Sequence, residues 1–360
     1  MLTGIFVTGA TGFVGSHFIY EWLRSRPGAV TALVRPRPGA DGHERLAAAL
    51  ETVRHSMNGA PAVTDALTAV EGDVVEPLCG LGPETIARLK AAGIDTFWHF
   101  ASDLRYEDRN RDLIERANID GAINAFELAR AVGAKRFVYI STAYVCGRSE
   151  GLIDETLLPL DREFSNSYEE TKARAEHILI ERCAAINLPL SILRPSIVIG
   201  PRVTKLSGGG QTGLFSLLHS VLWIRSSRAA QSGDLRVAAC PEAEINFIPV
   251  DCVVADMIGL AMNGFGPQRI YNLTAERSVS VAECWRAMSE VSGMDNVRLV
   301  PPDSFSPSPA EQLIARRIGF FLSYINADRR FARSLKPAWM LDTAEFADYV
   351  RVACGELSGG

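Results

Sequence analysis

The chain of 360 residues lacks several features that would place it in a specialised class. No segment approaches the ~18 uninterrupted apolar residues of a membrane span, so we expect no integral membrane segment. A net charge of −5 provides no basic field, and nucleic acid is therefore not an expected partner. Residues 1–8 have no basic start and no following cleavage site, so we expect a strand there rather than a signal peptide.

Metal-binding and disulfide patterns are also missing. The seven cysteines form no C-x-x-C motif and no cysteine–histidine set at metal-binding spacing. Their odd number favours reduced thiols, so we expect a cytoplasmic protein without a metal site. Hydrophobic residues make up 47% of the chain and charged residues 22%, which is typical of a globular protein. The length favours one large domain or two closely packed ones.

The first stretch with a clear pattern reads L-T-G-I-F-V-T-G-A-T-G-F-V-G, from Leu2 to Gly15. An apolar run, a glycine-rich turn and helical spacing follow one another, which predicts a strand that leads into a helix. The free N–H groups and the dipole of a helix N-terminus suit a pyrophosphate. A role is available for each of Gly9, Gly12 and Gly15. One glycine permits the tight turn, one lets the phosphate approach the backbone, and one lets the helix pack closely against the strand. The stretch therefore predicts dinucleotide binding, although its spacing is G-x-x-G-x-x-G rather than G-x-G-x-x-G.

The end of the second predicted strand, residues 30–35, bears on the choice of cofactor. An acidic residue there would bind the adenosine ribose and select NAD. Arg35 instead offers a bidentate partner for the 2′-phosphate of NADP. The alternative is a solvated surface arginine. We predict NADP as the cofactor.

Strands and helices alternate further along the chain. This alternation predicts an α/β fold, a Rossmann-type doubly wound parallel sheet with helices on both faces. Small residues after the strand at 96–100 leave room for a cofactor. We expect strands at 69–74, 96–100 and 137–141 and helices at 43–57 and 107–132.

A pair four residues apart, Tyr168 and Lys172, shares one face of a predicted helix that continues to about Asn187. An ammonium near a phenol favours the phenolate, so we expect the pKa of Tyr168 to lie below its usual value of about 10. Such a tyrosine can exchange a proton with a carbonyl oxygen. The hydroxyl of Thr142 would bind the same oxygen. Y-x-x-x-K also occurs by chance, and an exposed helix face is the alternative.

Four motifs together resemble the extended short-chain dehydrogenase/reductase superfamily over roughly residues 1–275. They are T-G-A-T-G-F-V-G, I-S-T-A-Y-V-C-G, Y-E-E-T-K and L-P-L-S-I-L-R-P-S-I-V-I-G-P. S-T-A-Y-V at 141–145 and R-P-S-I-V at 194–198 look most like the fatty acyl-CoA reductase and thioester reductase branch.

The resemblance implies a role for each matching residue. Thr142 matches the catalytic hydroxyl, Tyr168 the acid, and Lys172 the residue that binds the nicotinamide ribose. Asn118 matches the asparagine that supports the lysine through a water. Asp73 and Val74 match the pair beside adenine, and Pro195, Ser196 and Val198 the segment that faces the nicotinamide. The complete expected cofactor set is Thr8, Gly9, Thr11, Gly12, Phe13, Val14, Gly15, Arg35, Asp73, Val74, Phe100, Ala101, Ser102, Ser141, Tyr168, Lys172, Pro195, Ser196 and Val198.

The composition changes after residue 200. We expect residues 1–200 and 244–275 to form the NADP-binding Rossmann domain. Residues 201–243 and 276–360 would form a smaller, mostly helical substrate-binding region at the carboxyl ends of the strands. Within it we expect a flexible stretch at 207–213, a linker at 301–309 and helix over 310–354. An apolar helix at 213–224 would line an acyl pocket or simply pack, through Phe215, Leu218, Leu222 and Trp223.

Three other features of the sequence have an expected role, and two of them have an alternative. Asp251 is expected to cap a late helix. Residues 313–325 form a core or lid helix or a membrane-surface helix. A loose basic set receives the phosphates of CoA or phosphopantetheine, or is a solvated face; it comprises Arg202, Lys205, Arg225, Arg228 and Arg236.

The function that these expectations favour is NADPH-dependent reduction of an acyl thioester to an aldehyde or alcohol. The substrate would be an acyl-CoA or an acyl group on a carrier protein. One alternative is a carbonyl, hydroxysteroid-type or nucleotide-sugar-modifying enzyme of the same superfamily. Another is a non-catalytic NADP-binding sensor or scaffold.

Overall fold

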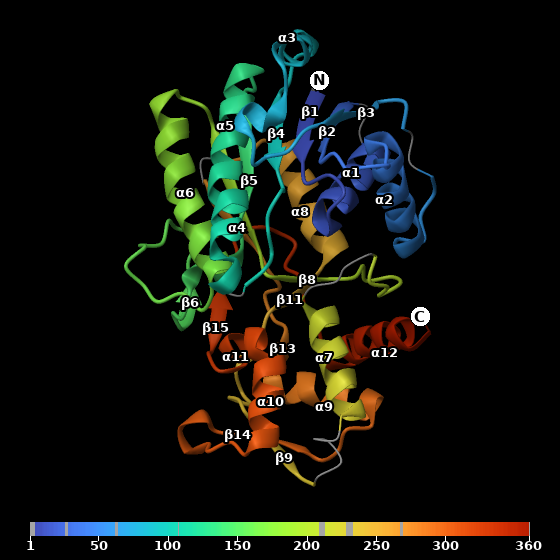
Figure 1. Ribbon diagram of the computed structural model, residues 1–360, viewed down its shortest axis with the longest axis vertical. Helices are drawn as coiled ribbons and strands as arrows, with labels where there is room; N and C mark the ends of the chain where they lie inside the picture. The colour runs from blue at the N-terminus through green and yellow to red at the C-terminus, as the bar shows by residue number, and fades with distance from the viewer. Residues whose placement is uncertain are drawn as a thin grey trace.

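The structure is a computed structural model, and it describes residues 4–25, 28–61, 64–106, 108–208, 213–227, 233–266 and 269–359. It has two regions, one built around a central sheet and one made mostly of helices (Figure 1). Among the described helices, none combines the length and the apolar character needed to cross a bilayer.

The central sheet has seven parallel strands in the order β12-β7-β5-β4-β1-β2-β3. Every residue of β1 and β4 is buried, as expected for parallel strands that are covered on both faces. The predicted Rossmann-type sheet is confirmed. The strands are β1 (Gly4–Thr8), β2 (Ala29–Val34), β3 (Leu67–Glu71), β4 (Thr96–His99), β5 (Arg136–Ile140), β7 (Leu190–Pro195) and β12 (Ile270–Leu273).

Helices cover both faces of this sheet (Figure 1). Separate apolar clusters join each helical layer to the strands, and together they form the core of this region. One layer contains α1 (Phe13–Ser25), α2 (Gly42–Ser56) and α8 (Val250–Asn263). The other contains α3 (Pro83–Ala92), α5 (Gly121–Ala131) and α6 (Ser167–Ala185).

The helix predicted at 107–132 begins later and contains an irregular turn. α4 (Arg111–Glu115) and α5 are joined by a π-helical segment, Arg116–Asp120. Such π segments inside α-helices often occur at functional sites. The predicted site residue Asn118 lies in this one.

The second region has its own apolar core. Its small strands pair as β9 (Leu235–Ala238) with β14 (Val297–Val300), and β10 (Glu244–Ile245) with β13 (Val279–Ser280). Two further pairs lie nearer the central sheet: β6 (Gly151–Ile153) with β15 (Arg329–Phe331), and β8 (Ile197–Ile199) with β11 (Phe247–Pro249). The helices are α7 (Leu214–Ser226), α9 (Val281–Ser292), α10 (Pro309–Arg317), α11 (Gly319–Ile325) and α12 (Thr343–Gly359).

Several detailed predictions were wrong. Residues 310–354 are not helical throughout, because β15 pairs with β6 there. Asp251 is not the cap of α8; the cap is Pro249, and the Asp251 carboxylate accepts a 3.2 Å hydrogen bond from the backbone N–H of Arg202. The strand expected at 69–74 is β3, which ends at Glu71. Residues 209–212 of the expected flexible stretch lie outside the described residues.

Candidate active site

The carboxyl ends of neighbouring parallel strands meet at one edge of the sheet, and many predicted site residues lie there. The order of the strands reverses around β1, so the crevice between β1 and β4 is a topological switch point. Folds of this kind bind dinucleotides at such a point. At this edge lie Thr8 at the end of β1, Arg35 after β2, Asp73 after β3, Phe100 after β4, Ser141 after β5 and Pro195 at the end of β7.

The turn between β1 and α1 is shaped by its glycines. Gly9 has a φ of +68°, and a Cβ there would lie 2.6 Å from the amide nitrogen of Ala101. A Cβ on Gly15 would lie 2.4 Å from the carbonyl oxygen of Gly9. At Gly12 it would meet only that same oxygen, at 3.2 Å. The first N–H groups of α1 have no partner within the helix, so the open turn fits the pyrophosphate of a dinucleotide.

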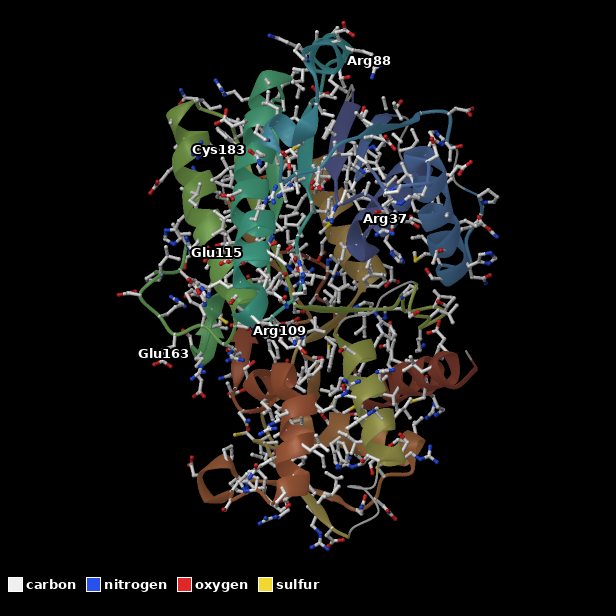
Figure 2. All side chains as sticks on the ribbon, in the orientation of Figure 1. Arg37, Arg88, Arg109, Glu115, Glu163 and Cys183 are labelled. Carbon is white, nitrogen blue, oxygen red and sulfur yellow. The ribbon has the colours of Figure 1, made fainter. Side chains whose placement is uncertain are left out.

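Two arginines, Arg35 and Arg37, follow β2, and a third, Arg45, lies on α2 near both of them. Arg37 is labelled in Figure 2. The exposed Arg35 has its Nε 3.6 Å from Oδ2 of Asp73. Arg45, from α2, donates a hydrogen bond to the backbone carbonyl of Arg35. Burial and then the positive charges of Arg37 and Arg35 lower the pKa of Arg45. This concentration of guanidinium groups suits a phosphate. Arg45 was missed from the sequence, because only packing of α2 brings it to Arg35.

The hydroxyl groups of Thr142 and Tyr168 lie near one another, and the Thr142 hydroxyl acts on the pKa of Tyr168. The Thr142 hydroxyl also donates a 3.5 Å hydrogen bond to the carbonyl oxygen of Pro195. Thr142 follows β5 and caps the short helical turn at 143–146, where its Oγ1 accepts a 3.3 Å hydrogen bond from the N–H of Tyr144. Tyr168 lies in the first turn of α6, which is capped by Asn166. Two hydroxyl groups are thus held side by side, as expected for a site that binds one carbonyl oxygen.

The side chain of Lys172 is buried, one turn after Tyr168 on α6. Its Nζ donates a 2.6 Å hydrogen bond to the carbonyl oxygen of Ile140 and lies 4.1 Å from the centroid of the Tyr139 ring. Burial lowers the pKa of Lys172 to about 7, against the opposing influence of Glu176. The ammonium is therefore held at the end of β5, beside the predicted cofactor edge.

The expectation of a lowered Tyr168 pKa was wrong. Burial, followed by the nearby carboxylate of Glu169, raises the pKa of Tyr168 above its usual value, and the neighbouring Thr142 hydroxyl only partly opposes this. Lys172 is not among the groups that shift the pKa of Tyr168; its Nζ donates a hydrogen bond to the Ile140 carbonyl, and burial lowers its own pKa. In this state Tyr168 keeps its proton.

Asn118 joins two parts of the site. Its Oδ1 accepts hydrogen bonds from the Ser102 hydroxyl at 3.0 Å and the Asp103 N–H at 2.7 Å. Its Nδ2 donates to the hydroxyl of Thr171 at 3.1 Å. Asn118 thus connects the loop after β4 with α6, immediately before Lys172.

Thr8 and Phe100, both predicted to contact the cofactor, make contacts within the protein. The Thr8 hydroxyl is 2.8 Å from Nδ1 of His99 and accepts from the Ala101 N–H at 3.3 Å. The Phe100 ring packs in the core against Phe18 and Trp98.

Ser196 and Ser141, both predicted to contact the cofactor, differ in the hydrogen bonding of their hydroxyl groups. Ser196 donates its hydroxyl proton to Oδ1 of Asn246 at 2.7 Å. The hydroxyl of Ser141, by contrast, is buried without a hydrogen-bond partner in the part of the chain that is described. Since buried hydroxyls are usually satisfied, this orphaned group fits a site that accepts a polar ligand.

A second contact that was missed reaches the site from the helical region. The Tyr324 hydroxyl on α11 donates a 3.0 Å hydrogen bond to Oε1 of Glu169, the residue after Tyr168. The Tyr324 ring packs edge-on against Tyr144, with centroids 4.5 Å apart. Tyr324 and Glu169 are 155 positions apart, so no local sequence pattern predicts this hydrogen bond.

Several residues that were predicted to bind the phosphates of CoA or to line an acyl pocket make other contacts in the structure. Arg202 pairs with Glu345 at 2.8 Å and Arg236 with Glu311 at 2.9 Å, while Arg228 lies outside the described residues. Phe215 and Leu218 pack in the core of the helical region. Within the described ranges, His, Cys, Asp and Glu form no group of three or more that could hold a metal ion.

The parallel sheet and the glycine turn between β1 and α1 are those of a Rossmann-type dinucleotide-binding fold. Residues 7–257, more than two thirds of the chain, match the profile of an NAD-binding family described as male sterility protein. The chain belongs to this family.

Two relatives show the breadth of the sequence similarity. Fatty acyl-CoA reductase 1 of Mus musculus is 24% identical over 348 residues, which cover 87% of this chain and 63% of that protein. The nonribosomal peptide synthetase asaC of Aspergillus flavus is 26% identical over 304 residues, 80% of this chain and 28% of that protein. The chain therefore spans less than two thirds of either relative.

Solved structures share the fold. The terminal R domain from the myxalamid PKS-NRPS pathway has a TM-score of 0.72 at 22% identity, covering 99% of this chain and 91% of that one. A thiolation-reductase di-domain of an archaeal nonribosomal peptide synthetase has a TM-score of 0.75 at 20% identity, covering 100% and 76%. UDP-glucose 4-epimerase of Bifidobacterium longum has a TM-score of 0.68 at 18% identity, covering 99% and 100%. At these identities the likeness concerns the fold alone.

Proposed function

We propose that this chain is an NADPH-dependent reductase of acyl thioesters carried by CoA or by a carrier protein, with an aldehyde or alcohol as product. The observation that carries the proposal is the placement of the Thr142 and Tyr168 hydroxyls near one another, at the edge of the sheet that also holds the dinucleotide turn. The sequence similarity to fatty acyl-CoA reductases and to peptide synthetases supports the choice of thioester.

The dinucleotide would be held at both ends by residues of this chain. The N-terminus of α1 would bind the pyrophosphate, and Arg35 and Arg45 the 2′-phosphate that distinguishes NADPH from NADH. Lys172 would bind the nicotinamide ribose, while Asn118 fixes the loop and the helix on either side of it. When bound, NADPH supplies the hydride.

The hydroxyls of Thr142 and Tyr168 would stabilise the negative charge on the thioester oxygen, and Tyr168 would transfer a proton to it. Thr142 and Tyr168 donate hydrogen bonds to the carbonyl oxygen, which gains negative charge as hydride adds to the carbonyl carbon. Tyr168 then gives its proton to that oxygen, forming a hemithioacetal. Breakdown of the hemithioacetal returns the proton to Tyr168, breaks the C–S bond and releases the thiolate, which takes a proton from solvent. The aldehyde remains.

The protonation state of Tyr168 favours the reductive direction. A proton donor is needed for reduction, and burial raises the pKa of Tyr168, so it carries a proton at neutral pH. An alcohol oxidation would need the phenolate at the start, which the buried environment disfavours.

A cytoplasmic location is part of the proposal. Its support is the state of the seven cysteines, all of which are free thiols. Free thiols of this kind persist in reducing compartments.

The deciding experiment supplies NADPH with acyl-CoA, carrier-bound acyl, ketone and UDP-sugar substrates, and identifies the products by mass spectrometry. Aldehyde or alcohol from the thioesters alone supports the proposal. Turnover of only ketones or only UDP-sugars would contradict thioester reduction and indicate another reaction known for this fold. Tight NADPH binding without turnover of any class would point to a cofactor-binding sensor.

A further inference from the structure

Glu169, the residue after Tyr168 on α6, places a carboxylate in the interior of the protein, where only 1% of the residue is exposed. Its Oε2 accepts a 3.0 Å hydrogen bond from the backbone N–H of Ser165. Its Oε1 accepts from Nδ2 of Asn166 at 3.2 Å and from the Tyr324 hydroxyl at 3.0 Å. A buried carboxylate is costly unless it is hydrogen-bonded, so these three donors hold a charge beside the proposed acid.

Helix capping explains only part of this arrangement. Asn166 caps α6, and its Oδ1 accepts a 2.9 Å hydrogen bond from the N–H of Glu169. A carboxylate in the first turn of a helix is favoured by the dipole and by the free N–H groups there. The contacts with Ser165 and Asn166 fit such a cap. The contact with Tyr324 does not, because it comes from α11 in the helical region.

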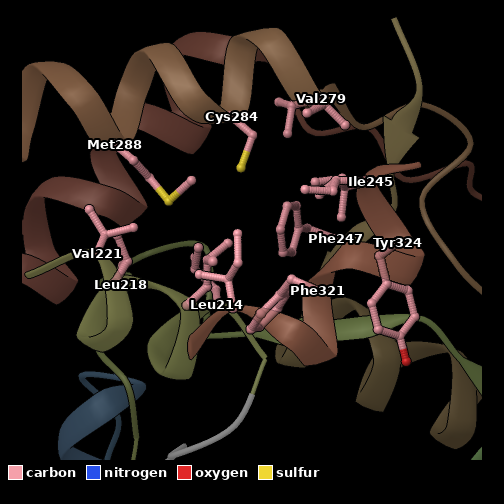
Figure 3. Packing of buried hydrophobic residues seen from close by; sticks show 14 of the residues in the cluster. Leu214, Leu218, Val221, Ile245, Phe247, Val279, Cys284, Met288, Phe321 and Tyr324 are labelled. Carbon is pink, nitrogen blue, oxygen red and sulfur yellow. The ribbon is translucent and has the colours of Figure 1, made fainter. Parts of the chain in front are cut away.

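Helix α11 is anchored in the helical region. The segment at 313–325 covers the end of α10 and all of α11, and it packs in the apolar core of that region. Figure 3 shows Phe321 among the core side chains, whereas Tyr324 lies at the edge of the cluster with its hydroxyl directed away from it. The core therefore holds the Tyr324 ring, while its hydroxyl reaches the sheet region.

Tyr324 contacts a neighbour of each proposed catalytic hydroxyl. Its own hydroxyl donates to Glu169, which follows Tyr168. Its ring packs edge-on against Tyr144, with centroids 4.5 Å apart, and the N–H of Tyr144 donates to Oγ1 of Thr142 at 3.3 Å. One side chain of the helical region thus supports both of the segments that carry the hydroxyls.

The donors around Glu169 match the ionised carboxylate. An ionised carboxylate only accepts hydrogen bonds, whereas protonation converts one oxygen into a donor and weakens the contacts with all three donors. Burial raises the pKa of Glu169 above its usual value, and the Ser165 N–H and the Tyr324 hydroxyl partly oppose this. Protonation of Glu169 therefore occurs nearer to neutral pH than protonation of an exposed glutamate.

The other titratable or charged groups around Glu169 keep one charge state near neutral pH. They belong to α6, to the turn at 143–146, to α11 and to β15. Burial raises the pKa of the three phenols and of the thiol among them, so these stay protonated, and the remaining group is a guanidinium. They are Tyr168, Tyr144, Cys146, Tyr324 and Arg329. Within this set, Glu169 is the group that changes charge as the pH falls below neutral.

We propose that Glu169 and Tyr324 are positioning residues, through which the helical region holds the Thr142 and Tyr168 hydroxyls in place for reduction. This inference rests on the proposed reductase function and adds a requirement, namely that Glu169 is ionised and bonded to Tyr324. The Tyr324 ring fixes the turn after Thr142, and the Glu169 carboxylate fixes the first turn of α6. A displacement of about 1 Å at reacting groups can cost ~10²-fold in rate, so a loosened contact lowers kcat.

The kinetics of Tyr324→Phe test the contact, because this change removes the hydroxyl and keeps the ring. For the thioester, kcat should fall roughly tenfold while NADPH affinity is unchanged. The acid limb of kcat should move to higher pH, since a donor that favours the charged carboxylate is lost. Tyr20→Phe removes the hydroxyl of a buried tyrosine that donates to the Ala60 carbonyl at 2.6 Å, and it should keep the wild-type profile. Wild-type kcat and pH profile in folded Tyr324→Phe would overturn the positioning role.

Glu169→Gln tests the charge, because the amide has the same shape and does not ionise. Its kcat should be low at every pH, and the acid limb that belongs to Glu169 should disappear. Glu170→Gln is the matched control: it removes the adjacent carboxylate, which pairs with Arg111 at 2.8 Å, and should keep the acid limb. An unchanged kcat and acid limb in Glu169→Gln would overturn the requirement for an ionised Glu169.

Nuclear magnetic resonance tests the same coupling without turnover. The protein is labelled with ¹³C at the ζ carbon of tyrosine, and the Tyr168 resonance is identified by its loss in Tyr168→Phe. In the wild-type protein this resonance should shift as the pH is lowered from neutral. The shift should be absent in Glu169→Gln and should occur at higher pH in Tyr324→Phe. A Tyr168 resonance that does not respond to pH in the folded wild-type protein would overturn the inference.

The two levels of the proposal fail in different ways. Thioester reduction with wild-type kcat and pH profile in both Tyr324→Phe and Glu169→Gln would retain the reductase and remove the positioning role. A pH response of the Tyr168 resonance without reduction of any thioester would overturn the reductase, and the coupling of Tyr168 to Glu169 would then have no part in thioester reduction.

Discussion

Lys172 Nζ donates a 2.6 Å hydrogen bond to the carbonyl oxygen of Ile140, the last residue of β5. This contact fixes the ammonium between α6 and the edge of the sheet where the cofactor is expected. The Lys172 side chain is buried, and this burial lowers its pKa to about 7. The positioning of this residue therefore has a cost in stability that depends on pH.

The first prediction concerns that dependence. Between pH 7 and pH 10 the unfolded chain holds the Lys172 proton more firmly than the folded chain, so the contribution of Lys172 to the free energy of unfolding rises with pH. Lys172→Met carries no charge at any pH. Urea unfolding should show the wild-type protein gaining stability relative to Lys172→Met from pH 7 to pH 9. The exposed Lys90→Met is the control, and a constant difference for Lys172→Met would contradict the lowered pKa.

The second prediction concerns the proton donor. Tyr168→Phe removes the group that protonates the carbonyl oxygen, and turnover should fall by roughly 10²- to 10⁴-fold while NADPH affinity is preserved. Stopped-flow NADPH oxidation and fluorescence titration measure the two quantities. Tyr349→Phe also removes a buried hydroxyl, one without a partner within the described part of the chain, and should keep its activity. Normal turnover of Tyr168→Phe would exclude Tyr168 as the acid.

The third prediction concerns cofactor selection. Replacing Arg35 or Arg45 by alanine removes a charged partner of the 2′-phosphate, and NADPH affinity should fall roughly ten- to a hundredfold with little effect on NADH. Arg35→Asp should have a larger effect because it adds repulsion. Arg24→Ala, an exposed arginine on α1, is the control. Equal losses of affinity for NADPH and NADH would mean that other residues bind the 2′-phosphate.

The features that were predictable from sequence are those set by local patterns. The glycine turn, the buried parallel strands and the position of Arg35 after β2 all depend on residues close together in the chain. Thr142 and Tyr168 were placed together through the motifs of the superfamily, and in the structure their hydroxyls lie near one another. Their catalytic roles remain predictions.

The features that were missed depend on packing between distant segments. Arg45 reaches Arg35 only because α2 packs beside β2, and Tyr324 reaches Glu169 across 155 positions. The shift of the Tyr168 pKa was predicted with the wrong sign because burial, the largest influence on it, cannot be read from the spacing of Tyr168 and Lys172.

The last prediction concerns the packing of the dinucleotide turn. A Cβ at position 15 would lie 2.4 Å from the carbonyl oxygen of Gly9, and this contact is with backbone, which cannot move aside as a flexible side chain does. Gly15→Ala should therefore push α1 away from the turn. The helix N-terminus would then be displaced from the pyrophosphate, so NADPH and NADH should lose affinity together, in contrast to the arginine variants.

Gly259→Ala on α8 provides the matched control, because a Cβ there meets nothing within 4 Å and alanine is the better helix former. It should leave cofactor affinity unchanged and raise the melting temperature slightly. Fluorescence titration with both cofactors and thermal unfolding of the two variants provide the comparison. Wild-type affinity in Gly15→Ala would mean that the turn tolerates a side chain at this position, and the helix N-terminus would then not be the pyrophosphate site.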